Sequence, residues 1–201
     1  STFFVISAAG WLLVVGAALF RSRAYAIFRG VTLGLQVLLA SALAPRFGAI
    51  FLAFCYLQAV VFVQAVGLVQ PRMRGLPYRI LISVPAAFFG AGTLLALPWA
   101  LAGAFGLVVP WVWLPYAGAA VGVFQSLFSR EETRDIVVGD QQVVAGLARH
   151  ASGSARVERP LRLVQITDPH LGPFMSVERL AHICARAVAK NPDLVLLTGD
   201  F

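Results

Sequence analysis

Residues 80–128 read ILISVPAAFFGAGTLLALPWALAGAFGLVVPWVWLPYAGAAVGVFQSLF, a run of 49 residues without a charged side chain. A helix crosses the roughly 30 Å of bilayer hydrocarbon with about 20 apolar residues. The run is therefore too long for one transmembrane helix and long enough for two, which we expect at about 80–98 and 108–128. Pro98 and Pro110 flank the connection between them, where a proline ends a helix at little cost.

Three further apolar stretches precede this run, each followed by a short polar break. We expect transmembrane helices at about 2–20, 24–44 and 47–69. The breaks contain arginine or proline: Arg21-Ser22-Arg23, Pro45-Arg46 and the loop 70–79. A soluble bundle of buried helices would need polar outer faces, which these stretches lack. Residues 1–129 are therefore predicted to be a transmembrane domain of about five helices.

The charges of the chain are unevenly distributed. Residues 1–129 contain no Asp, Glu, Lys or His, and their only charged side chains are seven arginines. Residues 130–201 contain nine basic and nine acidic residues, so the net charge of +7 comes from the apolar part. The arginines lie in gaps between apolar stretches, as in loops that orient membrane spans, and not on one soluble basic face. This distribution argues against nucleic-acid binding.

The loop arginines also predict an orientation. Loops 21–29 and 70–79 carry three arginines each, whereas the opposite side carries only Arg46. Arginine-rich loops favour the cytoplasmic side of a membrane. We therefore expect an integral, multi-pass protein, as in a bacterial inner membrane, with the lipid bilayer as its partner. Its N-terminus lies outside in this interpretation, and the region after residue 129 is cytoplasmic.

The chain changes character at residue 130. Residues 130–160 contain charges and glycines, and we expect a linker and domain entrance there. Residues 161–167 (LRLVQIT) predict a strand, and residues 176–190 predict an amphipathic helix because apolar side chains recur at steps of three and four. Residues 194–198 (LVLLT) are apolar throughout, which is typical of a buried parallel strand. Strand, helix and strand within about forty residues predict a βαβ unit.

Polar residues follow both predicted strands. Asp168-Pro169-His170 comes after the first, and Gly199-Asp200 comes after the second. The carboxyl ends of parallel strands share one edge of a sheet, so we expect Asp168, His170 and Asp200 to lie near each other. A carboxylate and an imidazole two residues apart can bind one metal ion, and a second carboxylate can bridge that ion to another. Two such ions stabilise the attacking and leaving oxygens of a phosphoester.

The stretch LRLVQITDPHLG, the helix after it and then NPDLVLLTGDF resemble the opening of the calcineurin-like metallophosphoesterase superfamily. That family has an Asp-x-His motif after its first strand and a Gly-Asp motif after its second. The resemblance covers residues 161–201. It implies that these residues begin a four-layer α/β/β/α sandwich. It also implies that Asp168 and His170 bind one divalent ion (Mn, Fe or Zn) and that Asp200 bridges two.

Other α/β folds, such as receiver-like and haloacid-dehalogenase-like domains, also place an aspartate after a strand, but they lack this combination of motifs. The family further uses an Asn-His pair and later histidines. This chain stops one residue after Asp200, so we expect a fragment that is inactive alone. His150 and His182 match no position of the family's motifs, and Cys55 and Cys184 lie in such different contexts that no disulfide framework is indicated.

The resulting functional hypothesis is a membrane-bound hydrolase of phosphomonoesters or phosphodiesters, with lipid-linked esters among its candidate substrates. The alternative is a non-catalytic membrane sensor or transporter with a degenerate α/β tail. Ion and proton pathways usually use intramembrane acids or histidines. Residues 1–129 contain none, which disfavours transport.

Overall fold

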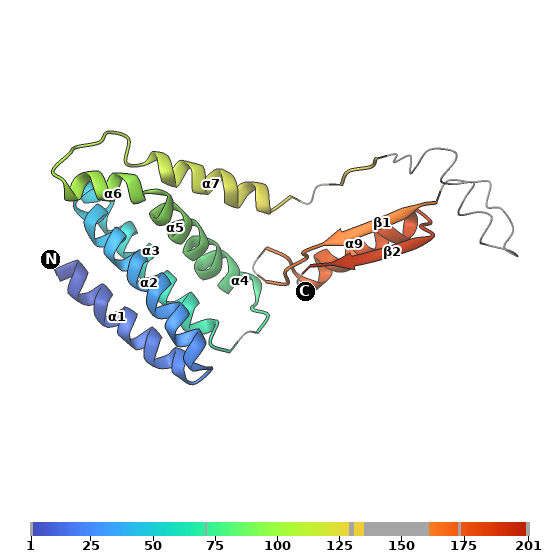
Figure 1. Ribbon diagram of the computed structural model, residues 1–201, viewed down its shortest axis with the longest axis horizontal. Coiled ribbons are helices and arrows are strands. Elements are labelled where there is room, and N and C mark those ends of the chain that lie inside the picture. Colours follow the sequence, from blue (N-terminus) through green and yellow to red (C-terminus); the bar gives the residue numbers. More distant parts are fainter. Residues whose placement is uncertain (1, 71, 129–130, 135–160, 173, 200–201) are drawn as a thin grey trace, which may run out of the picture. The chain divides into compact units, whose positions relative to one another are not determined.

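The computed structural model describes residues 2–70, 72–128, 131–134, 161–172 and 174–199. These parts of the chain are mostly helical and include one small parallel sheet (Figure 1). The chain divides into two compact units. We call them the helical unit, which holds the helices up to residue 128, and the α/β unit, which holds β1, α9 and β2. Most of the expected linker at 130–160 lies outside the described residues.

The first half of the helical unit consists of three apolar helices. They are α1 (Thr2–Leu19), α2 (Arg23–Leu43) and α3 (Phe51–Gly67). A 3₁₀ segment, η1 (Ala44–Ile50), joins α2 to α3, and the expected break at Pro45-Arg46 lies within it. Phe47 in this segment has non-helical backbone angles, φ −106° and ψ 29°. The chain therefore turns here, although the helical segments follow each other without a loop.

The second half is more broken. Its elements are α4 (Leu76–Tyr78), the π-helical η2 (Arg79–Ser83), α5 (Val84–Leu95), α6 (Leu97–Ala104) and α7 (Leu114–Ser126). The first three follow one another directly and make one helical stretch. Residues 105–113 contain no helix and include Trp111 at a positive φ of 57°. Figure 1 shows α1, α2, α3 and α5 side by side, in agreement with the contacts between these helices.

Three helical stretches of the described chain are long and apolar enough to cross a membrane: Thr2–Leu19, Arg23–Gly67 and Leu76–Leu95. They cover four of the expected spans, because Arg23–Gly67 contains both α2 and α3. The last expected span, 108–128, differs. Its helix α7 has 13 residues, which extend about 20 Å at 1.5 Å per residue. Pro115 stands in the first turn of α7, where proline is best tolerated, and the chain before it is not helical.

An aromatic cluster joins the helices of this unit. Phe54 of α3 lies edge-on to Phe89 of α5, with ring centroids 4.8 Å apart, and stacks on Phe47 of η1 at 5.0 Å. Tyr116 of α7 contacts both Phe47 and Phe89. Its ring lies so close to Gly92 of α5 that a Cβ at that position would be 2.5 Å from Tyr116 Cδ1. Close packing of helices at a small residue is typical of helices in lipid.

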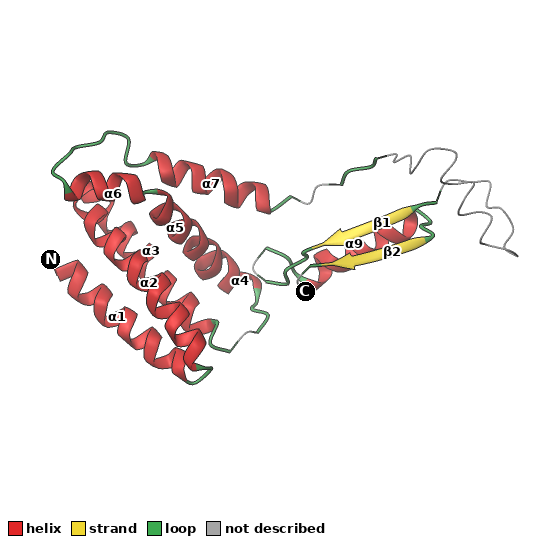
Figure 2. Ribbon diagram, in the orientation of Figure 1, coloured by secondary structure: helices red, strands yellow, loops and turns green. Residues whose placement is uncertain are grey.

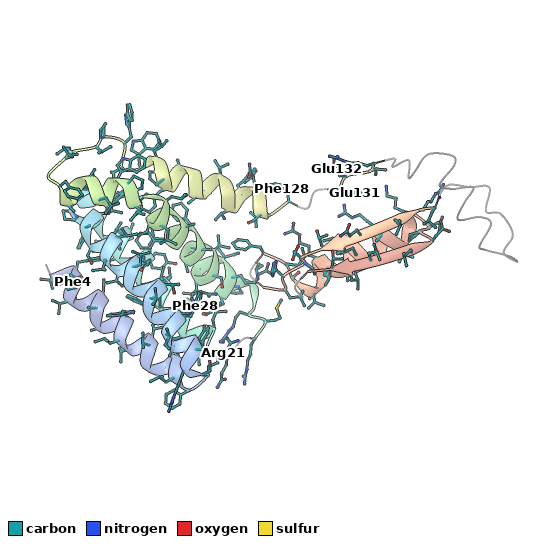
Figure 3. The ribbon with its side chains drawn as sticks, in the orientation of Figure 1. Phe4, Arg21, Phe28, Phe128, Glu131 and Glu132 are labelled. Atoms are coloured by element: carbon teal, nitrogen blue, oxygen red, sulfur yellow. The ribbon has the colours of Figure 1, made fainter. Side chains whose placement is uncertain are left out.

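The outer surface of the helical unit is apolar. Phe4 of α1 and Phe28 of α2, both labelled in Figure 3, are exposed, as are leucines along both helices. A helix satisfies its own backbone hydrogen bonds, so an apolar helical surface can face hydrocarbon without unpaired polar groups. These exposed apolar side chains agree with the sequence, in which these helices are apolar on every face.

The loop arginines bind helix ends. Arg21 donates to the Leu68 carbonyl at 2.8 Å, and Arg74 donates to the Gly67 carbonyl at 3.2 Å, both at the C-terminal end of α3. Cations favour this end of a helix because its carbonyl groups are unpaired and carry partial negative charge. Arg46, in η1 at the other end of α3, donates instead to the Leu107 carbonyl at 3.4 Å.

The α/β unit confirms the predicted order of strand, helix and strand (Figure 2). β1 spans Leu163–Thr167, α9 spans Val177–Ala189 and β2 spans Leu194–Thr198. The strands are parallel, with Leu163 opposite Leu194 and Thr167 opposite Thr198. Ser176 caps α9 by accepting a hydrogen bond from the Arg179 N–H at 3.2 Å. Asn191, at a positive φ of 48°, ends the helix as residues of this type commonly do.

The burial expected for β2 is not observed. Leu194, Val195, Leu196 and Leu197 are all exposed. Among the described residues of this unit, the buried ones are Ile166 of β1, Pro169 in the loop after it and Ala187 of α9. Successive side chains of a strand point to opposite faces of its sheet, so β2 is exposed on both faces. The prediction of a buried β2 rests on its continuous apolar sequence, which is typical of a strand in a sheet that is covered on both faces.

Candidate metal centre

The two strands end at the same edge of the sheet. Because Thr167 lies opposite Thr198, the next residues along the chain, Asp168 and Gly199, are neighbours at the carboxyl ends of the strands. The Asp168 N–H donates a hydrogen bond to the Thr198 carbonyl at 2.9 Å, which extends the pairing past β1. The Gln165 side chain also donates to the Thr198 hydroxyl at 2.9 Å. The beginning of the Asp-x-His motif is thus attached to the strand that precedes the Gly-Asp motif.

Asp168 and His170 adopt an unusual backbone conformation. Their φ angles are +45° and +38°, in the left-handed region that residues other than glycine rarely occupy. Such conformations cost about 1–3 kcal/mol and occur preferentially at functional sites. His170 Nε2 lies 3.8 Å from Asp168 Oδ1, and the two side chains are 64% and 60% exposed. The loop therefore presents a carboxylate and an imidazole together on the solvent side.

The distance between these two groups fits shared metal binding. Oxygen and nitrogen ligands typically lie about 2.0–2.2 Å from a metal such as zinc. Two ligands of one tetrahedral ion are therefore about 3.4 Å apart, and the 3.8 Å between His170 Nε2 and Asp168 Oδ1 is close to that value. Asp168 and His170 also supply the two ligand types, carboxylate and imidazole, that bind Zn, Mn and Fe. The pair that the structure describes fits a divalent ion.

Gly199 makes the close approach of the two motifs possible. Its φ of +83° is a conformation that side chains with a Cβ rarely adopt. A Cβ at this position would overlap the Asp168 carboxylate, at 2.5 Å from Cγ and 2.9 Å from Oδ2. Two features of this position therefore favour glycine: the positive φ angle and the lack of space for a Cβ. The sequence showed the Gly-Asp dipeptide but not this contact, which only the three-dimensional pairing of the strands reveals.

The third predicted ligand, Asp200, lies outside the described residues. Among the residues that the structure does describe, no group of three His, Cys, Asp or Glu side chains could hold a metal ion. The structure therefore brings together Asp168 and His170, and it places Gly199, the neighbour of Asp200, beside them. His182 and Cys184 are exposed on α9, and His150 lies outside the described residues.

Comparison with protein-family models, with curated proteins and with solved structures found no match to the chain.

Proposed function

We propose that the protein is a membrane-bound, metal-dependent phosphoesterase that hydrolyses a phosphomonoester or a phosphodiester. The observation that supports this most strongly is the shared edge of β1 and β2. There Asp168 and His170 stand 3.8 Å apart, and the Asp168 carboxylate packs against Gly199 of the Gly-Asp motif. Carboxylates and imidazoles that follow neighbouring parallel strands are the ligands that a two-metal phosphoesterase requires.

Each residue has a distinct role in this proposal. Asp168 and His170 bind one divalent ion (Mn, Fe or Zn), and Asp200 bridges it to a second. Bound ions of this kind lower the pKa of a water ligand and offset the charge that develops on the phosphate oxygens. Gly199 is a positioning residue, because it lets the second motif approach Asp168 without a steric conflict. The α/β unit would form the start of a four-layer α/β/β/α sandwich.

The helical unit serves as the membrane anchor in this proposal. We propose five spans, with the N-terminus outside and the α/β unit on the cytoplasmic side, as in a bacterial inner membrane. Arg21 and Arg74 bind the C-terminal end of α3, and Arg29 packs on Tyr25, the first-turn tyrosine of α2. Arg21 and Arg74 lie in the two polar breaks that carry the positive charge, and Arg29 lies in the second turn of α2. Anchoring brings the enzyme close to lipid-linked phosphoesters, which are candidate substrates.

Labelling of single cysteines tests the orientation. Cysteine is introduced at Thr2 or at Gly75 after Cys55 and Cys184 have been replaced, and an impermeant thiol reagent is added to intact cells. We expect labelling at position 2 and none at position 75, with both labelled after the cells are opened. Labelling at position 75 alone in intact cells would show that the orientation is inverted.

A phosphodiesterase assay tests the function itself. The protein is purified in detergent as the whole product of its gene, supplied with Mn²⁺ and assayed with bis-p-nitrophenyl phosphate. We expect metal-dependent turnover that Asp168→Asn lowers by about 100-fold or more, since replacing a residue that only supports a metal ligand already costs about 10–100-fold. His182→Ala, which removes an exposed histidine on α9, should retain the wild-type rate. Equal rates for Asp168→Asn and wild type would contradict the role of Asp168, and turnover no higher than in a protein-free blank would favour a non-catalytic membrane protein.

A further inference from the structure

The helical unit contains a cavity of about 300 Å³ between α2, α3, η2 and α5. Its walls are mainly apolar, with Leu33, Val61 and Ala86 among the lining residues. Five polar side chains also line it: Arg29, Thr32, Gln36, Gln64 and Ser83. A cavity of this size is at the lower limit of sites that bind small molecules. A concentration of polar groups inside helices that are otherwise apolar marks a functional site more often than a structural one.

The amide oxygens and the hydroxyl hydrogens that line this cavity are engaged in hydrogen bonds. Gln36 and Gln58 form a buried reciprocal pair, in which each amide N–H donates to the other's Oε1 at 3.0 and 3.1 Å. The Ser83 hydroxyl donates to Gln64 Oε1 at 2.9 Å. The Thr32 hydroxyl donates to the Phe28 carbonyl at 2.8 Å, within α2. Each amide oxygen and hydroxyl hydrogen of the lining thus has a partner inside the protein.

Beside the hydroxyl oxygens of Thr32 and Ser83, several N–H donors remain. Each amide nitrogen carries two N–H groups, so Gln36 keeps one beyond its bond to Gln58. Gln64 bonds to Ser83 through its oxygen, which leaves its amide nitrogen to face a ligand. Arg29 uses Nε for the Tyr25 hydroxyl, at 2.9 Å, and within the described part of the chain no bond is recorded for its two terminal nitrogens. Donors from α2 and α3 therefore line one cavity, which favours a ligand rich in acceptors.

The charge of the cavity favours an anion. Among the described residues that line the cavity, Arg29 is the only charged one, and residues 1–128 contain no Asp or Glu that could neutralise it. Arg29 stands seven residues after the N-cap Ser22, or about 10 Å along the helix at 1.5 Å per residue. Arg29 contacts the Tyr25 ring and hydroxyl, but neither carries the negative charge that would neutralise it. An arginine without such a partner is costly in a membrane, and an anionic group bound beside it offsets the cost. Guanidinium binds phosphate and carboxylate oxygens especially well.

We infer that this cavity binds the phosphate headgroup of an anionic membrane lipid, with Arg29, Gln64 and Gln36 as donors. Phosphate is the anion that bilayer lipids carry, and its oxygens can accept hydrogen bonds from several directions, as donors on different helices require. The apolar remainder of the walls accommodates the beginning of the lipid chains. Ser83, at the end of the π-helical turn η2, is a positioning residue because it fixes the amide of Gln64. Single π-helical turns occur frequently at functional sites.

Native mass spectrometry of the 201-residue chain in detergent tests this site. The probes are dioctanoyl phosphatidic acid, dioctanoylglycerol, which lacks the phosphate, and inorganic phosphate. We expect phosphatidic acid to bind as one molecule per chain and the two other probes to bind at least about tenfold more weakly, because each lacks one of the two features recognised. Equal binding of dioctanoylglycerol or of inorganic phosphate would overturn the assignment to a lipid phosphate.

Matched variants locate the binding. Arg29→Gln should weaken phosphatidic acid binding by about tenfold or more, the loss expected for a hydrogen bond between charged groups. Arg23→Gln is the control, because Arg23 is exposed on the same helix and does not line the cavity. The affinity of this variant for phosphatidic acid should stay within about twofold of wild type. Gln64→Leu tests the same site without a change of charge and should also weaken binding. Equal losses in Arg23→Gln and Arg29→Gln, or no loss in Gln64→Leu and Arg29→Gln, would overturn the inference.

The lipid site and the metal centre lie in different units of the chain. The binding experiment measures no hydrolysis, so loss of lipid binding leaves the phosphoesterase proposal unaffected. Absence of metal-dependent hydrolysis likewise leaves the lipid site unaffected.

Discussion

Both units of this protein expose many apolar side chains, but the backbone beneath them differs. In the helical unit, the exposed leucines of α1 belong to a helix whose backbone groups bond to each other, so hydrocarbon can cover this surface. In the α/β unit, the exposed residues Leu194–Leu197 sit on a two-stranded sheet whose outer edges carry unpaired backbone groups, which hydrocarbon cannot satisfy. The apolar surface of the first unit is therefore compatible with hydrocarbon, whereas that of the second unit is not.

The polar residues show the same contrast. In the helical unit they turn inward and pair, as Gln36 does with Gln58 and Ser83 does with Gln64. In the α/β unit Asp168 and His170 are mostly exposed at the end of a strand. A polar group in a bilayer must find its partner inside the protein, whereas a group that handles a soluble ion must stay accessible.

An aspartate introduced on the exposed apolar surface should produce the largest difference in free energy between the two units. Leu12 of α1 and Val188 of α9 are similarly exposed helical residues, at 62% and 66%. Leu12→Asp should cost about 3 kcal/mol of membrane insertion, the value for aspartate near the centre of a span. Val188→Asp should cost about 1 kcal/mol or less, as for an acidic group near a helix C-terminus.

The measurements are insertion of the α1 segment in a glycosylation-based assay and thermal unfolding of the purified chain. Similar penalties for Leu12→Asp and Val188→Asp would mean that the two exposed surfaces face the same medium, which would remove the contrast between the units.

Packing inside the helical unit should give the next largest effect. Gly92→Ala places a Cβ 2.5 Å from Tyr116 Cδ1 and should lower stability by about 1–3 kcal/mol, as overpacking of a tight interface does. Gly90→Ala, on the same helix, meets nothing within 4 Å and should raise stability by up to about 1 kcal/mol. Thermal unfolding in detergent, followed by tryptophan fluorescence, measures both. The same sign for the two variants would contradict the packing of α7 on α5.

In the α/β unit, Gly199→Ala should cost about 1–2 kcal/mol for the left-handed backbone alone, and the overlap with Asp168 adds to this. Gly199→Asn tolerates the backbone angle better but keeps the overlap, so comparison of the two variants separates the two causes. We expect both to weaken Mn²⁺ binding, measured by electron paramagnetic resonance. Wild-type Mn²⁺ binding by Gly199→Ala would show that the approach of the two motifs does not matter.

The smallest effect concerns an exposed ion pair. Lys190 hydrogen-bonds Glu131 at 2.9 Å and, together with its charge, lowers the pKa of that carboxyl. A pKa that is lower in the folded state stabilises the fold above the unfolded-state pKa, and this contribution disappears as pH falls through the folded-state pKa. Glu131→Gln should therefore be slightly less stable than wild type at pH 7 and equally stable at low pH. Glu132→Gln is the control, because Glu132 pairs with Arg134 in its own segment.

Thermal unfolding at a series of pH values checks this prediction. An undiminished difference between Glu131→Gln and wild type at low pH would contradict it, since protonated Glu131 can no longer form an ion pair.

Local patterns were sufficient to predict the elements of the α/β unit and most apolar helices. β2 was predicted at 194–198 and lies there, and Ser176 caps α9 as its side chain suggests. Apolar periodicity and capping depend on nearby residues, so one sequence contains them. The short α7 was not predicted, because hydropathy does not separate helix from apolar loop in the uncharged run from residue 80 to 128. Pro110 and Pro115 were the local signals for its late start.

Contacts between residues far apart in the sequence could not be predicted from local patterns. Gln36 and Gln58 are 22 residues apart, and nothing near either residue indicates the other. The π-helical turn before Ser83 and the approach of Gly199 to Asp168 likewise depend on how distant segments meet. At the candidate site, the sequence alone shows that Asp168 and His170 are two residues apart. The parallel register, with Thr167 opposite Thr198, explains why Asp168 also lies beside Gly199.

Metal content of the full-length gene product, measured by elemental analysis in Asp200→Asn, His170→Ala and wild type, tests the metal centre most directly. A bridging carboxylate holds both ions, and without it two like charges lie close together, so Asp200→Asn should lose both ions and nearly all phosphodiesterase activity. His170 is proposed to bind only one ion, so His170→Ala should lose mainly that one. Retention of both ions and a near-normal rate by Asp200→Asn would contradict the bridging role and the metal centre proposed around it.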